Sequence, residues 1–355
     1  MINYSFTVLL SILGSFVLVT ILIPKISWII TNRNLIHHPN LRSSHLSSIP
    51  AMAGISFFLA LLFILVVMQE WDVDAISINL IASVGLIFAI GLKDDLVIST
   101  PRAKIGGEIM AICILLFCKC LEVNSLNGFL GIYEISNTVS YSIVILMILI
   151  IINSYNLIDG IDGLASIVGI VIFSIYSYLF YITGLIFYFL LCISFIGMLL
   201  AYLRYNLSKT EKVFMGDTGS LIMGFFIGFV SLKFLTIDTL PLENIGLKPE
   251  NNFIVIIAIL IVPLFDTFRV ILVRLLNKKG LFKADNNHIH HILIGLGLTH
   301  FRASLCLGFF NLLLTTMIIF LSTIFESFFM MMMILLCFLV LLGVFYFMKT
   351  KVILK

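Results

Sequence analysis

The stretch VSYSIVILMILIIINSYNLIDGIDGL, residues 139–164, changes from apolar to polar residues at its middle. Its first half is a nearly unbroken apolar run. Its second half carries Asn153, Asn156, Asp159 and Asp162 at intervals of three residues. About 20 apolar residues cross the hydrocarbon core of a bilayer as one helix. Because polar side chains in that core cost free energy, the pattern indicates a membrane helix that ends at a polar site.

Apolar runs of this kind recur along all 355 residues, of which 61% are hydrophobic and 11% charged. A soluble protein carries about 25% charged residues. The composition therefore predicts an all-α polytopic membrane protein, a single integral-membrane domain over residues 1–355, and a bilayer rather than a nucleic acid as partner. Eleven transmembrane helices are expected, at 5–23, 50–69, 76–92, 105–121, 139–155, 164–182, 185–203, 217–235, 253–273, 303–323 and 328–347.

The distribution of basic residues predicts the orientation, because cytoplasmic loops are enriched in Lys and Arg. With the N-terminus outside and the C-terminus cytoplasmic, all 21 Lys and Arg residues except Lys119, Lys233 and Lys248 fall on the cytoplasmic side. The first span is not expected to be a cleaved signal peptide, because Lys25 follows its apolar stretch rather than preceding it.

Six aspartates then lie at the cytoplasmic ends of predicted spans. An aspartate at the bilayer centre costs roughly 2.5–3.5 kcal/mol, so these carboxylates must border water, a cation or each other. Their position predicts one polar site that opens to the cytoplasm. The six residues are Asp94, Asp95, Asp159, Asp162, Asp217 and Asp266.

The spacing within two of these segments refines the prediction. Gly160 and Gly163 predict that the helix breaks near Asp159, so that Asn156 and Asp159 share a face and Asp162 is free to cap the next helix. In KDDL, residues 93–96, neighbouring aspartates on a helix point about 100° apart, so only one faces the site fully. A solvated helix end is the alternative for KDDL.

The segments VFMGDTGSL (213–221) and HIHH (288–291) add further candidates. Asp217 is either the N-cap of a helix or a ligand of Mg²⁺, which prefers one or two carboxylates together with substrate phosphates. Three histidines also suit a transition metal. No local carboxylate or cysteine completes such a site, so donors to a sugar or diphosphate are favoured. The six cysteines are assigned to packing.

Five motifs in this order resemble the polyprenyl-phosphate N-acetylhexosamine-1-phosphate transferases. They are KDDL (93–96), NSYNLIDGIDGL (153–164), VFMGDTGS (213–220), PLFDT (263–267) and HIHH (288–291). HHPNLRSSHLSSIPAMAGI (37–55) is similar to the first cytoplasmic loop of that family. The resemblance runs from about residue 37 to residue 300.

The resemblance implies that a UDP-activated N-acetyl sugar gives its sugar-1-phosphate to undecaprenyl phosphate, releasing UMP. The implied cofactor is Mg²⁺, with Mn²⁺ as a substitute, and the implied location is the bacterial inner (plasma) membrane with the active site facing the cytoplasm. The resemblance implies Asp94, Asp95 and Asp159 as catalytic, Asp217 as the metal ligand, and His45, Asn156, Arg274, His288, His290 and His291 as substrate-binding. Direct attack is favoured over a phosphorylated aspartate, and a homodimer is left open.

The sequence leaves the sugar open. The HIHH loop favours GlcNAc and the branch that begins O-antigen, common-antigen or teichoic-acid linkage units, whereas FucNAc, QuiNAc, GalNAc and MurNAc-pentapeptide are alternatives. Ala51, Ala53 and Asn286 depart from the family's pattern, and the change at Asn286 bears on diphosphate binding or sugar choice. A membrane transporter is the alternative of another class, but it would hold its acidic residues near the bilayer midplane.

Overall fold

The computed structural model describes residues 4–33, 50–97, 99–278 and 288–353, and nearly all of them are helical. The α-helices are α1 (Tyr4–Leu9), α2 (Ser15–Asn32), α3 (Ala53–Val67), α4 (Ser77–Leu96), α5 (Pro101–Leu115), α6 (Asn137–Ile158), α7 (Leu164–Ile182), α8 (Ile186–Asn206), α9 (Gly216–Leu235), α10 (Thr239–Asn244), α11 (Asn252–Ile259), α12 (Ile261–Leu276), α13 (Ile289–Gly295), α14 (His300–Ser322) and α15 (Ser327–Ile353). Short turns of helix lie at Leu10–Gly14, Gln69–Trp71, Lys119–Leu121 and Pro249–Asn251. The all-α prediction is confirmed, apart from one small antiparallel hairpin of β1 (Ser125–Phe129) and β2 (Ile132–Glu134).

Within the described residues, eight helices are long and apolar enough to cross a membrane, or nine if the bent pair α11–α12 is one span. Each of the eleven predicted segments contains a helix, but α3 and α5 are only 15 residues long. At 1.5 Å per residue, each is about 22 Å long, shorter than the hydrocarbon core of about 30 Å. The structure therefore defines a multi-pass membrane protein, and the number of eleven spans stays a prediction.

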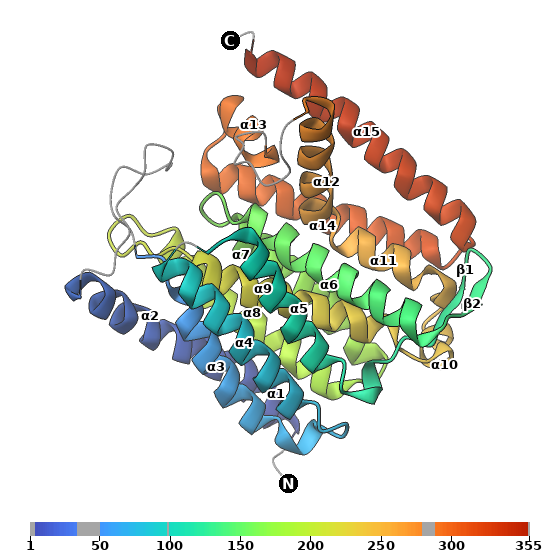
Figure 1. Cartoon of the computed structure of the whole chain (residues 1–355), viewed down its shortest axis with the longest axis horizontal. Helices are drawn as coiled ribbons and strands as arrows, with labels where there is room; N and C mark the ends of the chain where they lie inside the picture. Colours follow the sequence, from blue (N-terminus) through green and yellow to red (C-terminus); the bar gives the residue numbers. More distant parts are fainter. Residues whose placement is uncertain (1–3, 34–49, 98, 279–287, 354–355) are drawn as a thin grey trace.

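Helix α9 forms the centre of the bundle and is buried from Thr218 to its end at Leu235. Figure 1 shows it enclosed by its neighbours, with α2 at one edge of the molecule and α15 at the opposite edge. Gly91 of α4 lets the backbones of α4 and α9 come close together. A Cβ atom at this position would lie 2.5 Å from the Cα of Thr218, so a larger residue would not fit. Small residues allow membrane helices to approach in this way. The contact brings the end of α4 against the start of α9.

The bend of 71° between α11 and α12 exposes backbone groups that side chains of α14 satisfy. Asn311 donates to the carbonyl of Ile259 at 3.1 Å and accepts from the N–H of Val262 at 3.4 Å. Thr315 donates to the carbonyl of Ala258 at 2.9 Å. Broken helices are tolerated at membrane depth where protein groups satisfy the freed backbone. The bend therefore belongs to the fold, and it was not predicted from the apolar run at 253–273.

Candidate active site

The carboxylate of Asp95 joins the end of α4 to the first turn of α9. It accepts hydrogen bonds from the backbone N–H of Asp217 at 2.7 Å and of Thr218 at 2.9 Å, and from the Thr218 hydroxyl. A carboxylate is favoured at a helix N-terminus, where backbone N–H groups lack partners and the helix dipole is positive. The cap of α9 is therefore Asp95. Asp217 lies inside the first turn of the helix, so the alternative that it is the N-cap was wrong.

Side chains from two helices contact the carboxylate of Asp217. Its Oδ1 atom accepts a hydrogen bond of 2.7 Å from Asn156 at the end of α6. The same atom forms an ion pair of 2.6 Å with Lys104 at the start of α5. The Lys104 ammonium also contacts Asp94 of α4 at 3.0 Å. Burial alone would lower the pKa of Lys104, but the attraction of Asp217 and Asp94 outweighs it and raises that pKa. The structure thus brings Asp95, Asn156 and Lys104 into contact with Asp217, and Lys104 adds Asp94 to the cluster.

The turn after α6 places Asp159 beside this cluster. Helix α6 ends at Ile158, as predicted, and Asp159 follows as its C-cap. Burial, together with the negative charges of Asp217 and Asp95, raises the pKa of Asp159 to about 7. A carboxyl with this pKa can change its protonation state near neutral pH, which a general base requires.

The second aspartate of the turn has a different role from the one predicted for it. Asp162 contacts Lys212 at 2.6 Å and the Nδ1 atom of His300 at 3.2 Å. The N-cap of α7 is instead Gly163, whose φ of +81° is accessible to glycine at little cost. Asp162 therefore holds the turn to two neighbouring segments, and the alternative that it caps α7 was wrong.

The histidine segment reaches the same turn from α13. His290 is buried, and a Cβ atom on Gly160 would lie 2.5 Å from its Nε2 atom. Its ring lies 4.4 Å from that of His291, centroid to centroid. Burial, and next the neighbouring His291, lowers the pKa of His290 to about 3, so this imidazole is neutral at physiological pH. His290 is thus placed beside the turn that carries Asp159.

Of the remaining candidates, His288 and Arg274 lie among the described residues, and the ring of His288 stacks on that of His290 at a centroid distance of 5.5 Å. His288 contacts the buried carboxylate of Asp266 at 2.8 Å, and the N–H of Ile289 donates to the same carboxylate at 2.8 Å. Arg274 is buried in the last turn of α12. His45 and Asn286 lie outside the described residues.

The two other departures from the family's pattern, Ala51 and Ala53, lie at or just before the start of α3 and contact the start of α9 and the loop before it. The carbonyl oxygen of Ala51 approaches Gly216 so closely that a Cβ atom there would lie 2.2 Å from it. The N–H of Ala53 donates to the carbonyl of Phe214 at 3.4 Å. This segment therefore packs against the loop that leads into Asp217.

Sequence reasoning missed two residues of the site. Lys104 was counted only as a topological signal, although it bridges Asp94 and Asp217. Asp266 was noted among the acidic residues but given no role, and it anchors His288 and the start of α13. One feature of the sequence could have identified both residues: each lies in or next to a polar segment at the predicted cytoplasmic end of a span.

The described side chains set limits on how a metal could bind. Among them, no group of three His, Cys, Asp or Glu side chains is arranged to hold a metal ion. Asp217 is partly exposed, at 35%, and Asp94 contacts the same Lys104 ammonium. One or two carboxylates completed by substrate phosphates is the arrangement that Mg²⁺ prefers. The donor set therefore fits Mg²⁺ bound together with a phosphorylated substrate.

An apolar groove of about 790 Å³ begins next to the polar cluster. It runs along α6 and is closed on the other side by α11 and α12, with Ile105 of α5 and Asn153 of α6 among its lining residues. Asn153 precedes Asn156 by three residues, or about 4.5 Å along a helix. The groove and the Asp217 cluster are therefore adjacent.

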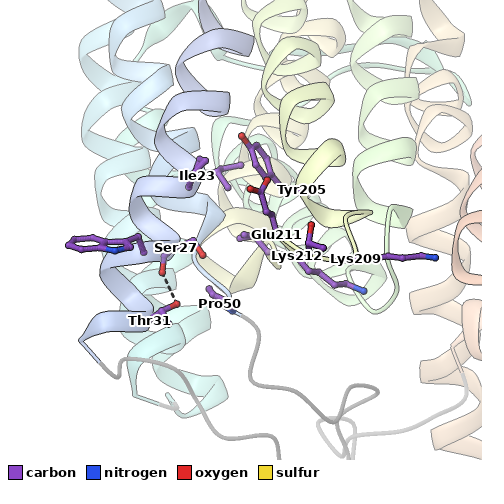
Figure 2. A pocket seen from close by; sticks show the side chains of 12 residues that line it. Ile23, Ser27, Thr31, Pro50, Tyr205, Lys209, Glu211 and Lys212 are labelled. Carbon is purple, nitrogen blue, oxygen red and sulfur yellow. Dashed lines mark hydrogen bonds between the residues drawn. The ribbon is translucent and has the colours of Figure 1, made fainter.

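A second pocket, of about 490 Å³, lies between α2 and the loop that joins α8 to α9. Figure 2 shows Ser27 and Thr31 on one wall and Glu211, Lys209 and Lys212 from the loop. None of the candidate site residues that the structure describes lines this pocket. Lys212 connects it to the turn after α6 through the ion pair with Asp162.

The fold and the site define a class: a multi-pass membrane protein with a carboxylate-rich site at one end of its bundle and an apolar groove beside it. The profile of Glycosyl transferase family 4 matches residues 77–235, which include Asp94, Asp159 and Asp217.

Curated relatives agree with this class. The undecaprenyl-phosphate alpha-N-acetylglucosaminyl 1-phosphate transferase of Pasteurella multocida is 31% identical over 281 residues, covering 78% of this chain and 75% of its own. The protein of the same name from Haemophilus influenzae is 28% identical over 316 residues, covering 88% and 85%. A probable undecaprenyl-phosphate N-acetylglucosaminyl 1-phosphate transferase of Bacillus subtilis is 41% identical over 108 residues, covering 30% and 26%. The chain belongs to Glycosyl transferase family 4 and is a phosphosugar transferase.

Proposed function

We propose that the chain transfers GlcNAc-1-phosphate from UDP-GlcNAc to undecaprenyl phosphate, with release of UMP. The product is the lipid-linked first sugar of a cell-surface polysaccharide. The reaction takes place at the bacterial inner membrane, with the site facing the cytoplasm. The names of the Pasteurella and Haemophilus relatives support the lipid and the sugar.

One observation carries this proposal: the polar cluster and the apolar groove meet along α6. Asn156 contacts Asp217, whereas Asn153, about one turn earlier, lines the groove. A polyprenyl phosphate has an anionic head and a long apolar tail, so it needs both environments next to each other. The location of the carboxylates at one end of the bundle also disfavours a transporter, which binds its substrate near the bilayer midplane.

The reaction is a displacement at phosphorus. An oxygen of the lipid phosphate forms a bond to the β-phosphorus of the UDP-sugar, the bond from that phosphorus to the bridging oxygen breaks, and UMP leaves with that oxygen. Asp159 accepts a proton from the lipid phosphate, and the Lys104 ammonium orients that phosphate. Asp95 positions Asp217 by capping α9. Catalysis of this kind depends on positioning and electrostatic stabilisation.

In this proposal Asp217 holds Mg²⁺, with Asp94 beside it. When bound, the cation offsets negative charge on the diphosphate and the leaving group. Mn²⁺, which also accepts carboxylate and phosphate oxygens, is expected to substitute. His290 and His291, at the Asp159 turn, contact the sugar or diphosphate.

The test uses membranes that contain the protein, undecaprenyl phosphate, Mg²⁺ and radiolabelled UDP-GlcNAc. Label should enter the organic phase with an equal amount of UMP, and Asp217→Asn should abolish both. Parallel reactions with UDP-GalNAc, UDP-FucNAc, UDP-QuiNAc and UDP-MurNAc-pentapeptide identify the preferred donor. Transfer from another donor alone would correct the sugar, and transfer from none would reject the function.

A further inference from the structure

Helix α5 carries a buried acid that the proposed chemistry does not use. The side chain of Glu108 is fully buried, and its Oε2 atom accepts a hydrogen bond of 2.7 Å from the Nδ2 atom of Asn153. Its Oε1 atom has no hydrogen-bond partner among the described residues. An ionisable side chain in the membrane part of a bundle is costly, and such residues usually serve function. Packing alone does not explain an acid here, since an apolar side chain would fill the same space without this cost.

Glu108 fixes the orientation of the Asn153 amide. The second N–H of that amide donates to the carbonyl of Leu149 at 2.9 Å, so both of its donors are used. Asn153 lines the apolar groove, and so does Ile105, three residues before Glu108. The Glu108–Asn153 bond therefore ties α5 to α6 at the edge of the groove.

This bond lies one helical turn from the polar cluster on both helices. Glu108 follows Lys104 by four residues, or about 6 Å along the same face of α5. Asn153 precedes Asn156 by three residues on α6. Lys104 and Asn156 both contact Asp217. A lipid whose phosphate contacts Lys104 would therefore place its first isoprene unit beside the Glu108–Asn153 bond.

We propose that Glu108 is a positioning residue. It holds Asn153 at the junction of the groove and the polar cluster, and the pair thereby fixes the position of the polyprenyl phosphate head relative to the cluster. This inference rests on the proposed function and extends it, because it assigns acceptor-lipid recognition to a pair outside the carboxylate cluster. The pair acts on the lipid and leaves the nucleotide sugar unaffected.

The experiment measures initial rates of the purified full chain in nanodiscs, varying undecaprenyl phosphate and UDP-GlcNAc separately. Glu108→Leu should raise the KM for the lipid about tenfold, the effect of one lost buried hydrogen bond, and leave the KM for UDP-GlcNAc within about twofold. Glu108→Gln retains an acceptor for Asn153 and should restore the wild-type KM for the lipid. Asn153→Ala should resemble Glu108→Leu, and adding it to Glu108→Leu should have little further effect, because both remove one bond.

Other outcomes overturn the inference. An unchanged lipid KM in Glu108→Leu, an equal rise for both substrates, or failure of Glu108→Gln to restore the lipid KM would each reject it. If Glu108→Leu does not fold, Asn153→Ala carries the same expectation and the same rejection. The wild-type chain is assayed first: absence of transfer there rejects the proposed function itself, whereas an active wild type with unchanged variants rejects only the role of Glu108.

Discussion

The carboxylate of Asp95 accepts a hydrogen bond of 2.7 Å from the backbone N–H of Asp217, 122 residues further along the chain. One helix end is therefore capped by a side chain from another helix, and that end carries the central carboxylate of the site. Asp95 and its neighbour Asp94 consequently differ in role: Asp95 holds the backbone of α9, whereas Asp94 contacts Lys104.

Removing the cap should cost both stability and activity. Asp95→Ala is expected to lower the free energy of unfolding by about 1–2 kcal/mol and to reduce transfer, because Asp217 shifts. Asp72→Ala is the matched control, since Asp72 caps the other end of α4 through the N–H groups of Ile76 and Ser77. Thermal unfolding in detergent and the transfer assay should show a similar loss of stability for both variants, but a loss of activity only for Asp95→Ala. Equal activity of the two variants would contradict this assignment.

Lys104 should be required for transfer. Lys104→Met removes the ammonium that contacts Asp94 and Asp217, and we expect kcat/KM to fall about 100-fold or more, the loss typical of one electrostatic donor in an active site. Lys93→Met, which removes an exposed lysine of α4, should leave the rate within about twofold. A small effect of Lys104→Met on the rate, in a chain that remains folded, would exclude Lys104 from the active site.

His290 should make stability depend on pH. Its pKa is lowered to about 3 in the folded chain, from 6.5, by burial and next by His291. The unfolded chain therefore binds a proton below pH 6.5 that the folded chain does not, and stability falls as the pH falls toward 3. At pH 5 the loss relative to pH 7 is about 2 kcal/mol. Thermal unfolding of the wild type and His290→Gln at both values should show a smaller acid loss in the variant, and parallel losses would refute the prediction.

Asp159 should make the rate depend on pH. Burial, together with the charges of Asp217 and Asp95, raises its pKa to about 7. If the ionised form accepts the proton from the lipid phosphate, kcat/KM rises with pH through the pKa of Asp159, which burial keeps above the ordinary value of a carboxyl. Asp159→Asn should be slow and lack that rise. A variant that keeps the same midpoint would assign the titration to another group.

The sequence allowed some of this to be predicted, because the physical signals were local. Apolar runs predicted every long helix, and Gly160 and Gly163 predicted the break after Ile158. Aspartates at helix ends predicted a shared site, since six such carboxylates inside the bilayer would be unstable.

What could not be predicted depends on contacts between distant segments. Lys104 lies 113 residues from Asp217, and no local pattern distinguishes a lysine that binds carboxylates from one that fixes topology. The roles of Asp95 and Asp162 are likewise set by other helices. The bend at Leu260 depends on α14, whose Asn311 and Thr315 satisfy the broken backbone.

The contact between Gly160 and His290 gives the most specific test of the histidine segment. In Gly160→Ala the new Cβ would lie 2.5 Å from the Nε2 atom, so the imidazole must move. We expect the KM for UDP-GlcNAc to rise several-fold, while the KM for the lipid, which is bound along α6, stays unchanged. Gly85→Ala is the control, because a Cβ there meets no atom within 4 Å; this change within α4 should be neutral or stabilising by about 0.5–1 kcal/mol. An unchanged KM for UDP-GlcNAc in Gly160→Ala would mean that His290 supports the turn without contacting the nucleotide sugar.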